Sequence, residues 1–334
     1  MKKLVLVCLM LTVLSSWLFA GGRGDAGRPI TLRYAHVGIP GEIQSQFAYD
    51  FAELVRQRTN GQVIIQVFPN SQLGGVLEMV DGVRSGAICI GQHEFSSLER
   101  FVSEMGAYNA PFVFRDTQHV LAATCPRTSP VMQRLNNDLI RAGNMRVIGR
   151  VYRGKRQLST NFPVFSPADL SGRRIRGVPT PIFMTMIQGM GAIPTPIDIT
   201  ELYTALLTGV VEGQENPITN IYTQRFHEVQ THIMMTAHMV SIPAVFINER
   251  VWQSLSPEHQ RILYQALEDA NSLAVQRTYE DEAPLIRVME AAGVTFIDEA
   301  AGLRLDLFRQ GVAAQMAIDY PQWNSVLREL ENIR

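Results

Sequence analysis

The sequence predicts an α/β protein whose chain forms two lobes connected by a long helix. Three observations carry this prediction. Residues 30–91 alternate strand, helix, strand, helix and strand, the order of a parallel sheet covered by helices. The 334 residues exceed what one small hydrophobic core organises, so two lobes are expected. A helical pattern that opens at Ser256 continues to about Arg287, far enough to extend along both lobes.

The first residues have the pattern of an export signal. Lys2 and Lys3 precede an apolar run, residues 4–14, and small residues lead to an expected cleavage point at Ala20/Gly21. Residues 1–20 are therefore predicted to be a signal peptide, which places the mature chain in the periplasm. Because a membrane span needs about 20 residues, an uncleaved N-terminal anchor at residues 4–20 is the alternative.

The first half of the chain supplies the strands and helices of one lobe. Residues 30–37 alternate in polarity as a strand does, and residues 63–68 and 87–91 form further strands. Between them, apolar residues recur at helical spacing and end at Asn60-Gly61 and Ser85-Gly86. The first helix is marked by Phe47, Phe51, Leu54 and Val55, and the second by Val76, Met79, Val80 and Val83.

The second half begins with a predicted strand at residues 145–150 and another at 158–161. Three arginines, Arg173, Arg174 and Arg176, end a short strand, and a helix follows. Asp198 and Glu201 have the spacing of a capping box ahead of the next helix. Residues 214–217 are expected to turn, because the residue before a proline avoids the helical region.

The remaining chain is predicted to hold a strand within residues 241–251 and then the long helix. Ser256 is its expected N-cap and Pro257 its first residue, with Pro284 kinking or ending it. Residues 293–298 form a last strand, and residues 303–330 are helical.

Composition excludes several classes of function. The chain has 30 basic and 31 acidic residues, so it lacks the basic excess of a nucleic-acid-binding domain. Only three of the basic residues are lysines, Lys2, Lys3 and Lys155. Arginine is thus the default cation, and its abundance alone does not indicate an anion site. Cys89 and Cys125 do not make a disulfide framework.

Motifs of enzymes are missing from the sequence. None of the histidines pairs with a second histidine and a glutamate at the spacing of a zinc helix, and neither a nucleophile elbow nor a phosphate-binding glycine loop occurs. The pair Glu212 and Glu215 is interpreted as structural. The chain is therefore predicted not to be an enzyme and to use no cofactor and no metal.

Several segments resemble the extracytoplasmic solute-binding proteins of TRAP transporters, the DctP type. The resemblance rests on the pattern R-I-R-x-V-P at residues 174–179, P-T-P followed by E-L-Y-T-A-L at 194–206, and G-Q-E-N-P at 213–217. The first half adds T-N-G-x-V at 59–63, S-Q-L-G at 71–74 and A-P-F-V-F-R-D-x-x-H at 110–119. The resemblance therefore extends over nearly the whole exported chain.

The resemblance implies a two-lobed periplasmic-binding-protein fold, type II-like, with the long helix spanning both lobes. Residues 29–153 with 242–281 would form lobe I, and residues 154–241 with 282–334 would form lobe II. Ligands of open α/β sheets lie at the ends of strands, and the loops at residues 36–42 and 92–95 would face the cleft.

By the same resemblance, Arg176 forms the two-pronged salt bridge with a ligand carboxylate. A guanidinium suits this role because it offers paired donors and stays charged. Here the spacing to Pro179 is one residue longer than is usual in the family. Arg156 is expected to supply a second contact, with Arg153 as its competitor, and Asn216 is expected to hydrogen-bond the ligand.

Glu94 is the residue chosen from the first-lobe loops. The apolar side of the ligand is assigned to Phe183 and to Ile199, which stands where acid-binding members often have phenylalanine. Met184, Met186 and Met190 crowd the helix that contains Phe183. Methionine fills cores and lines permissive sites, so core filling and an apolar binding pocket are both open.

The predicted function is capture of a small organic anion, such as a monocarboxylate, and its delivery to a TRAP-type membrane permease. The sequence leaves open whether a tetratricopeptide-repeat periplasmic partner also takes part. Two alternatives remain: a carrier of a fatty, aromatic or branched acid in a methionine-lined pocket, and a sensor that signals to a membrane receptor.

Overall fold

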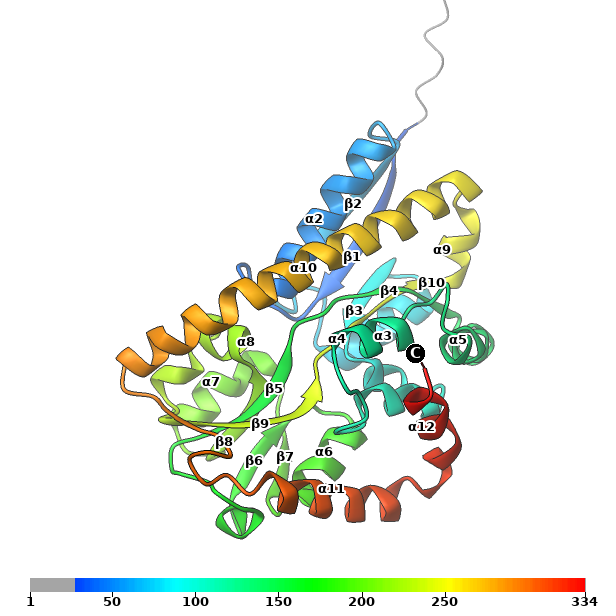
Figure 1. Ribbon diagram of the computed structural model, residues 1–334. Coiled ribbons are helices and arrows are strands. Elements are labelled where there is room, and N and C mark those ends of the chain that lie inside the picture. Colours follow the sequence, from blue (N-terminus) through cyan, green and yellow to red (C-terminus); the bar gives the residue numbers. More distant parts are fainter. Residues whose placement is uncertain (1–27, 334) are drawn as a thin grey trace, which may run out of the picture.

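A computed structural model describes residues 28–333, which form two β-sheets flanked by helices (Figure 1). The predicted signal peptide lies outside these residues. The first sheet has the strand order β2-β1-β3-β10-β4. The strands β1, β2 and β3 are parallel, and β10 is antiparallel to both of its neighbours. Their bounds are β1 Ile30–His36, β2 Val63–Phe68, β3 Ile90–His93, β4 Met145–Arg150 and β10 Ala244–Asn248.

The helices of this sheet follow the predicted apolar periodicity. Helix α2 (Ile43–Arg58) buries Phe47, Phe51 and Val55, and removing each such side chain from water contributes roughly 1.5–3 kcal/mol. Helix α3 (Val76–Ser85) ends at Gly86, whose φ of 86° is left-handed. The third strand begins three residues later than the predicted position 87. The first sheet also carries α4 (Thr117–Ala123), α5 (Pro130–Gly143) and α9 (Glu249–Ser254), with turns of 3-10 helix η1 (Phe95–Leu98) and η2 (Ser103–Asn109).

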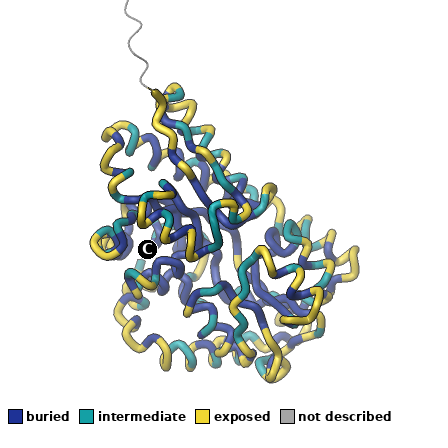
Figure 2. The backbone as a smooth tube through the Cα atoms, turned by 180° about the vertical axis from the view of Figure 1, so that it is seen from behind, coloured by how far each residue is buried: buried dark blue, intermediate teal, exposed yellow. Residues whose placement is uncertain are grey.

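The second sheet has the order β11-β9-β5-β8-β6-β7. Parallel pairs join β6 to β7 and β8, whereas β5 is antiparallel to β8 and β9. Both sheets are buried at the centre, and their helices are exposed on the outer face (Figure 2). The bounds are β5 Lys155–Thr160, β6 Arg174–Gly177, β7 Ile193–Pro196, β8 Gly213–Pro217, β9 His232–Val240 and β11 Thr295–Ile297; the helices are α6 Pro181–Gly189, α7 Ile199–Leu207 and α8 Ile218–Thr223, with η3 Pro167–Leu170 and η4 Phe226–Glu228.

The turn expected at residues 214–217 is wrong, because these residues form β8. The strand is buried along its whole length and pairs with β5. A residue before a proline prefers extended backbone, and a strand satisfies this preference as well as a turn does. Proline is tolerated because it ends the strand, where α8 begins. Asp198 is the N-cap of α7 as expected, but its side chain makes no capping hydrogen bond.

The long helix α10 runs from Pro257 to Ala291 and contacts both α2 and α8. It thereby spans the two sheets, which confirms the predicted α/β architecture (Figure 1). The Ser256 hydroxyl caps it by accepting from the His259 amide at 3.1 Å. Pro284 does not end the helix. It lies on an exposed face, where water can reach the carbonyl that loses its donor. Within residues 28–333 the helices include none with the length and apolarity of a membrane span.

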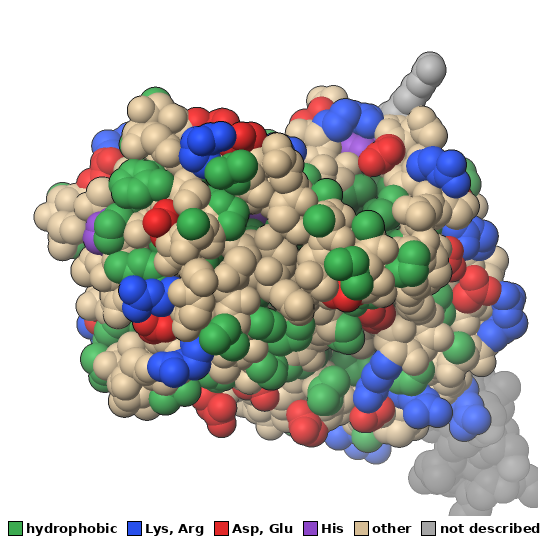
Figure 3. Space-filling view, turned by 90° about the horizontal axis from the view of Figure 1, so that it is seen from below, with side chains coloured by type: hydrophobic (Ala, Val, Ile, Leu, Met, Phe, Trp, Pro, Cys, Tyr) green, Lys and Arg blue, Asp and Glu red, His purple; other side chains and the backbone are tan. Residues whose placement is uncertain are grey.

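The helix expected over residues 303–330 is interrupted. Helix α11 (Leu305–Asp319) ends before Pro321, a single turn η5 (Pro321–Trp323) follows, and α12 is Asn324–Glu331. Helix α11 packs on α6, whereas α12 packs against α5 and η2. The end of the chain therefore returns to the helices of the first sheet. The lobe boundaries at residues 153/154 and 241/242 stay predictions. On the face seen in Figure 3, acidic and basic side chains are interspersed.

Candidate functional site

A small cavity lies between the two sheets at the carboxyl ends of their parallel strands. Val37 follows β1, Glu94 follows β3, Arg176 lies near the end of β6 and Asn216 near the end of β8. This is where open α/β sheets bind their ligands. The cavity measures about 30 Å³ and is lined by Val37, Gln44, His93, Glu94, Arg153, Arg156, Arg176, Val178, Ile199, Asn216, Asn220 and Pro243.

Arg176 carries the unpaired charge of the cavity. Its side chain is 2% exposed, and its Nε donates to the Ile197 carbonyl at 2.7 Å. Within residues 28–333 no carboxylate lies within 4.0 Å of its guanidinium and no hydrogen bond engages Nη1 or Nη2. Burial lowers the pKa of Arg176 to about 10. The two free nitrogens are thus a paired donor set with no carboxylate in contact, as a ligand carboxylate requires.

The other arginines of the predicted cluster have structural partners. Arg173 pairs with Glu212 at 2.7 Å, and Arg174 donates to the carbonyls of Gly209 and Val210. Only Arg176 of the three reaches the cavity. At the glycine after it, Gly177, a Cβ would lie 2.5 Å from the Met184 Cε, so a side chain there would require Met184 to move.

Arg156 lines the cavity but is already paired. Its Nε and Nη2 both bond the Glu215 carboxylate, and Nη2 also donates to the Asn216 Oδ1 at 3.1 Å. Burial alone raises the pKa of Glu215, but Arg156 and the His238 hydrogen bond hold it down at about 2. The Nη1 of Arg156 has only long contacts, 3.4 Å to Glu94 and 3.5 Å to Ser241. Nη1 is therefore the part of Arg156 available to a ligand.

Glu94 and Asn216 both face the cavity within hydrogen-bond networks. The Glu94 carboxylate accepts from the Ser241 hydroxyl at 2.5 Å and from the Asn109 amide at 2.9 Å. Asn216 donates to the Gln214 Oε1 at 2.6 Å while accepting from Arg156. These contacts fix the orientation of both side chains at the cavity wall.

Arg153, the predicted competitor of Arg156, also reaches the cavity. It is 7% exposed, and its Nη2 lies 3.9 Å from the Glu42 Oε2. Burial lowers the pKa of Arg153 and raises that of Glu42. The Glu42 carboxylate accepts from Gln44 at 2.5 Å and from Gln224. Arg153 and Arg156, the two candidates from the sequence, thus both line the cavity, and each has a different acidic partner.

Neutral polar groups complete the lining. Burial lowers the pKa of His93 to about 3, and the guanidinium of Arg153 lowers it too, so the ring is uncharged at neutral pH. The His93 Nδ1 and the Asn220 Oδ1 are buried and lack hydrogen-bond partners within residues 28–333. Buried polar atoms are normally paired, so these two indicate that a polar molecule is to be accommodated here.

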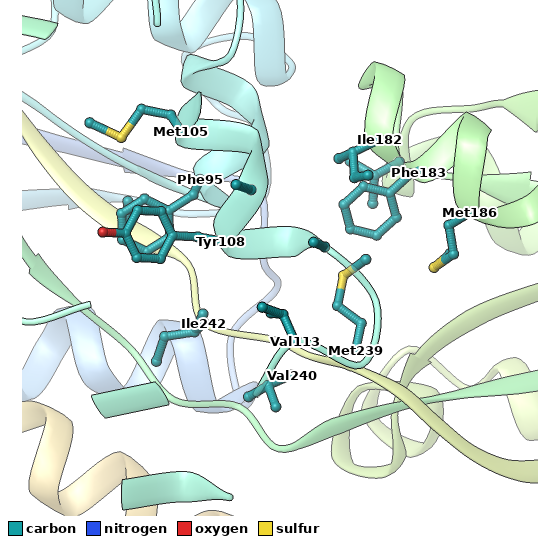
Figure 4. Close-up of a cluster of buried hydrophobic side chains, with 14 of the residues drawn as sticks. Phe95, Met105, Tyr108, Val113, Ile182, Phe183, Met186, Met239, Val240 and Ile242 are labelled. Carbon is teal, nitrogen blue, oxygen red and sulfur yellow. The ribbon is translucent and has the colours of Figure 1, made fainter. Parts of the chain in front are cut away.

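The predicted apolar residues divide between cavity and core. Ile199 lines the cavity, whereas Phe183 does not. The Phe183 ring packs under Arg156 with its centroid 5.1 Å from the guanidinium carbon. Figure 4 shows Phe183 and Met186 in the buried apolar cluster that also holds Ile182 and Met239. The methionines of α6 belong to this core and do not line the cavity.

Other residues at the cavity were not predicted from the sequence: Glu42, Gln44, His93, Asn220 and, for its role, Glu215. Glu42 and His93 fall inside the two loops that were predicted to face the cleft, so the strand-end rule had located them without distinguishing them. Asn220 lies in the first turn of α8, directly after β8. A polar residue at the first turn of a helix that follows a strand end is the pattern that would have identified it.

The chemistry of the site is that of non-covalent anion binding. Three guanidinium groups and one carboxylate line the cavity, and uncharged donors and acceptors fill the remaining wall. In the described part of the chain no three histidine, cysteine or acidic side chains are grouped so as to hold a metal ion. Two sheets with a charged cavity between them define the class of two-lobed solute-binding proteins.

Comparison with known proteins gives the family. Residues 34–310 match the family described as bacterial extracellular solute-binding protein, family 7 (DctP). The chain belongs to this family. A solute-binding protein of Verminephrobacter eiseniae is 33% identical over 74% of this chain and 73% of its own. The 2,3-diketo-L-gulonate-binding periplasmic protein of Escherichia coli is 29% identical over 91% of this chain and 92% of its own.

Solved structures agree with this assignment. A TRAP periplasmic solute-binding protein of Actinobacillus succinogenes with bound L-galactonate aligns with a TM-score of 0.83 and 26% identity, over 90% of this chain and 99% of its own. One from Polaromonas bound to D-erythronate has a TM-score of 0.82 and 26% identity, over 91% and 99%. The resemblance predicted from sequence motifs is thereby confirmed.

Proposed function

We propose that this chain binds a small hydroxylated organic acid through one carboxylate and delivers it to a TRAP-type permease. The observation that carries the proposal is Arg176, a buried guanidinium with two free nitrogens and no acidic partner within residues 28–333. Leaving such a charge unpaired is costly. A ligand carboxylate would offset that cost, and the gain is large because the site is shielded from water.

The rest of the cavity favours hydroxyl groups over an apolar tail. His93 and Asn220 have unpartnered polar atoms, and Gln44 and Asn216 add amide groups. Hydroxyl groups both donate and accept, so they suit such a mixed wall. The ligands in two of the similar structures, L-galactonate and D-erythronate, have this chemistry. The hydrophobic-carrier alternative is not favoured, because the α6 methionines pack in the core.

Ligand entry requires the two halves of the site to separate. The cavity of about 30 Å³ is far smaller than the roughly 300–1,000 Å³ typical of ligand pockets. Hydrogen bonds already cross between elements of the two sheets: Thr180 donates to Ser96 at 3.0 Å, and Gln224 donates to Glu42. We infer that the ligand binds an open arrangement and that closure brings Arg176 and His93 around it.

The cellular setting follows from family membership in outline. The family is extracellular, which agrees with the export signal predicted at residues 1–20. We further propose that this segment is cleaved and that the ligand is captured for a permease rather than for a receptor. A tetratricopeptide-repeat partner is an optional part of this proposal. A permease gene beside this one would support transport, whereas a receptor gene would support sensing.

Native mass spectrometry of the protein as purified tests the proposal directly. Release and identification of a hydroxylated carboxylate would support it. The purified protein is then titrated calorimetrically with D-erythronate, L-galactonate, succinate and decanoate. Saturating acid at 100 times Kd should stabilise the fold by about 2.7 kcal/mol. Binding of decanoate alone would overturn the proposal and restore the hydrophobic-carrier interpretation.

A further inference from the structure

A second buried guanidinium, that of Arg153, lines the same cavity as Arg176. Within residues 28–333 its side chain donates no hydrogen bond, and Glu42 is the one carboxylate within 4.0 Å, at 3.9 Å. That distance lies beyond hydrogen bonding. Glu42 therefore compensates the charge of Arg153 without using up its N–H donors.

The position of Glu42 is fixed from both sides of the cleft. Gln44, in the first turn of α2, donates to Oε2 at 2.5 Å, and Gln224, which follows α8 beside the second sheet, donates to Oε1. Gly38 leaves the space that the Gln44 side chain occupies, since a Cβ at Gly38 would lie 2.1 Å from the Gln44 Nε2. Two amides thus hold the carboxylate at its distance from Arg153 once the two halves of the site have closed around a ligand.

From this geometry we infer that Glu42 is a specificity-determining residue that restricts the cavity to ligands with a single carboxylate. The inference rests on the proposed function. Arg176 receives the carboxylate, because it has no acidic partner. Arg153 offers its free donors to hydroxyl or carbonyl oxygens. A second carboxylate at Arg153 would lie beside the fixed charge of Glu42, and like charges in a buried site repel strongly.

Two ligands that differ in one group test this inference. D-Erythronate and meso-tartrate have the same four carbons, but the terminal hydroxymethyl of the first is a carboxylate in the second. L-Galactonate and galactarate form the same kind of pair at six carbons. Calorimetric Kd values at pH 8 should show that the wild-type protein prefers the monocarboxylate of the pair it binds. Glu42→Gln, which keeps the shape and removes the charge, should improve the dicarboxylate affinity relative to the monocarboxylate by about tenfold or more.

Two variants separate charge compensation from a general disturbance. Glu42→Gln with Arg153→Gln should weaken the binding of both ligands, because Arg153 also donates to ligand hydroxyls, but it should lose the gain in dicarboxylate affinity, so that the ratio of the two Kd values returns to within about threefold of wild type. Glu53→Gln removes an equal charge from the exposed pair with Arg56 and should change neither Kd.

These measurements separate failure of the role inferred for Glu42 from failure of the proposed function. If no monocarboxylate binds to the wild-type protein, the proposed function fails and this inference fails with it. If monocarboxylates bind and Glu42→Gln leaves the ratio of the two Kd values unchanged, only the role of Glu42 is overturned. A wild-type protein that prefers the dicarboxylate would show that Arg153 receives a second carboxylate despite Glu42.

Discussion

Replacing Arg176 by glutamine should weaken ligand binding and, at the same time, stabilise the unliganded protein. Both effects have one cause: the guanidinium is buried, 2% exposed, and has no acidic partner in the described chain. In the proposed complex a ligand carboxylate would pair with it. Without a ligand the charge is desolvated and is offset only by the more distant carboxylates of Glu215 and Asp198, so its removal should stabilise the folded state.

The magnitudes follow from the burial and the missing partner. Removing one member of a buried, hydrogen-bonded charge pair costs about 2–5 kcal/mol, on the order of 30- to 4,000-fold in Kd. Burial lowers the pKa of Arg176 from its ordinary value to about 10. That difference disfavours the charged form by on the order of 3 kcal/mol. Arg176→Gln should therefore raise the unliganded free energy of unfolding by up to about this amount.

Calorimetric titration and urea unfolding of the same preparations measure the two effects. Arg174→Gln is the matched control, because Arg174 lies on the same strand, is exposed and bonds backbone carbonyls. Arg176→Lys keeps the charge and loses the paired donors, so its Kd should lie between those of wild type and Arg176→Gln. An Arg176→Gln protein that binds within threefold of wild type, or that is less stable without ligand, would refute the assignment.

Three further predictions concern stability. Glu215→Gln should cost about 3–5 kcal/mol in urea unfolding, because a buried arginine loses its partner, while Glu53→Gln, in the exposed pair with Arg56, should leave the free energy of unfolding nearly unchanged; equal losses would contradict this. Burial lowers the pKa of His36 to about 4 and that of His93 to about 3. The unfolded chain then binds more protons below pH 6.5, so stability is complete above pH 6.5 and falls as pH drops towards 4, by on the order of 3 kcal/mol per histidine; a His93→Gln profile as steep as wild type would refute its share. Gly311→Ala places a Cβ 2.3 Å from a backbone carbonyl of α6 and should cost about 1–3 kcal/mol by thermal or urea unfolding, and an unchanged midpoint would show that α11 shifts freely.

Sequence rules that act over a few residues correctly predicted those element boundaries that depend on neighbouring residues alone. The bounds of β2 and β4 were predicted to the residue, since β-branched runs and turn residues delimit them. The start of α10 was also correct, because a serine cap, a first-turn proline and an acidic residue act within one turn. The end of α10 was not, since an exposed Pro284 does not break a helix that packs against α2 and α8.

Residues 213–217 show the opposite case. A local rule on the residue before proline allows extended backbone in a turn or in a strand. Pairing with β5, more than fifty residues earlier in the chain, decides for the strand. The same pairing brings Glu215 to Arg156 and occupies most of that arginine, a contact that no spacing in the sequence reveals.

The sequence alone determined the class of fold and the family, and it predicted Arg176 as the residue that contacts the ligand. Apolar periodicity, caps and motifs are written along the chain, and each acts over a few residues. Only the tertiary structure decided which charges are paired: Arg156 with Glu215 and Arg153 with Glu42, whereas Arg176 has no carboxylate of residues 28–333 within 4.0 Å. Compensation depends on distances of 3–4 Å between side chains far apart in sequence, and folding alone sets those distances.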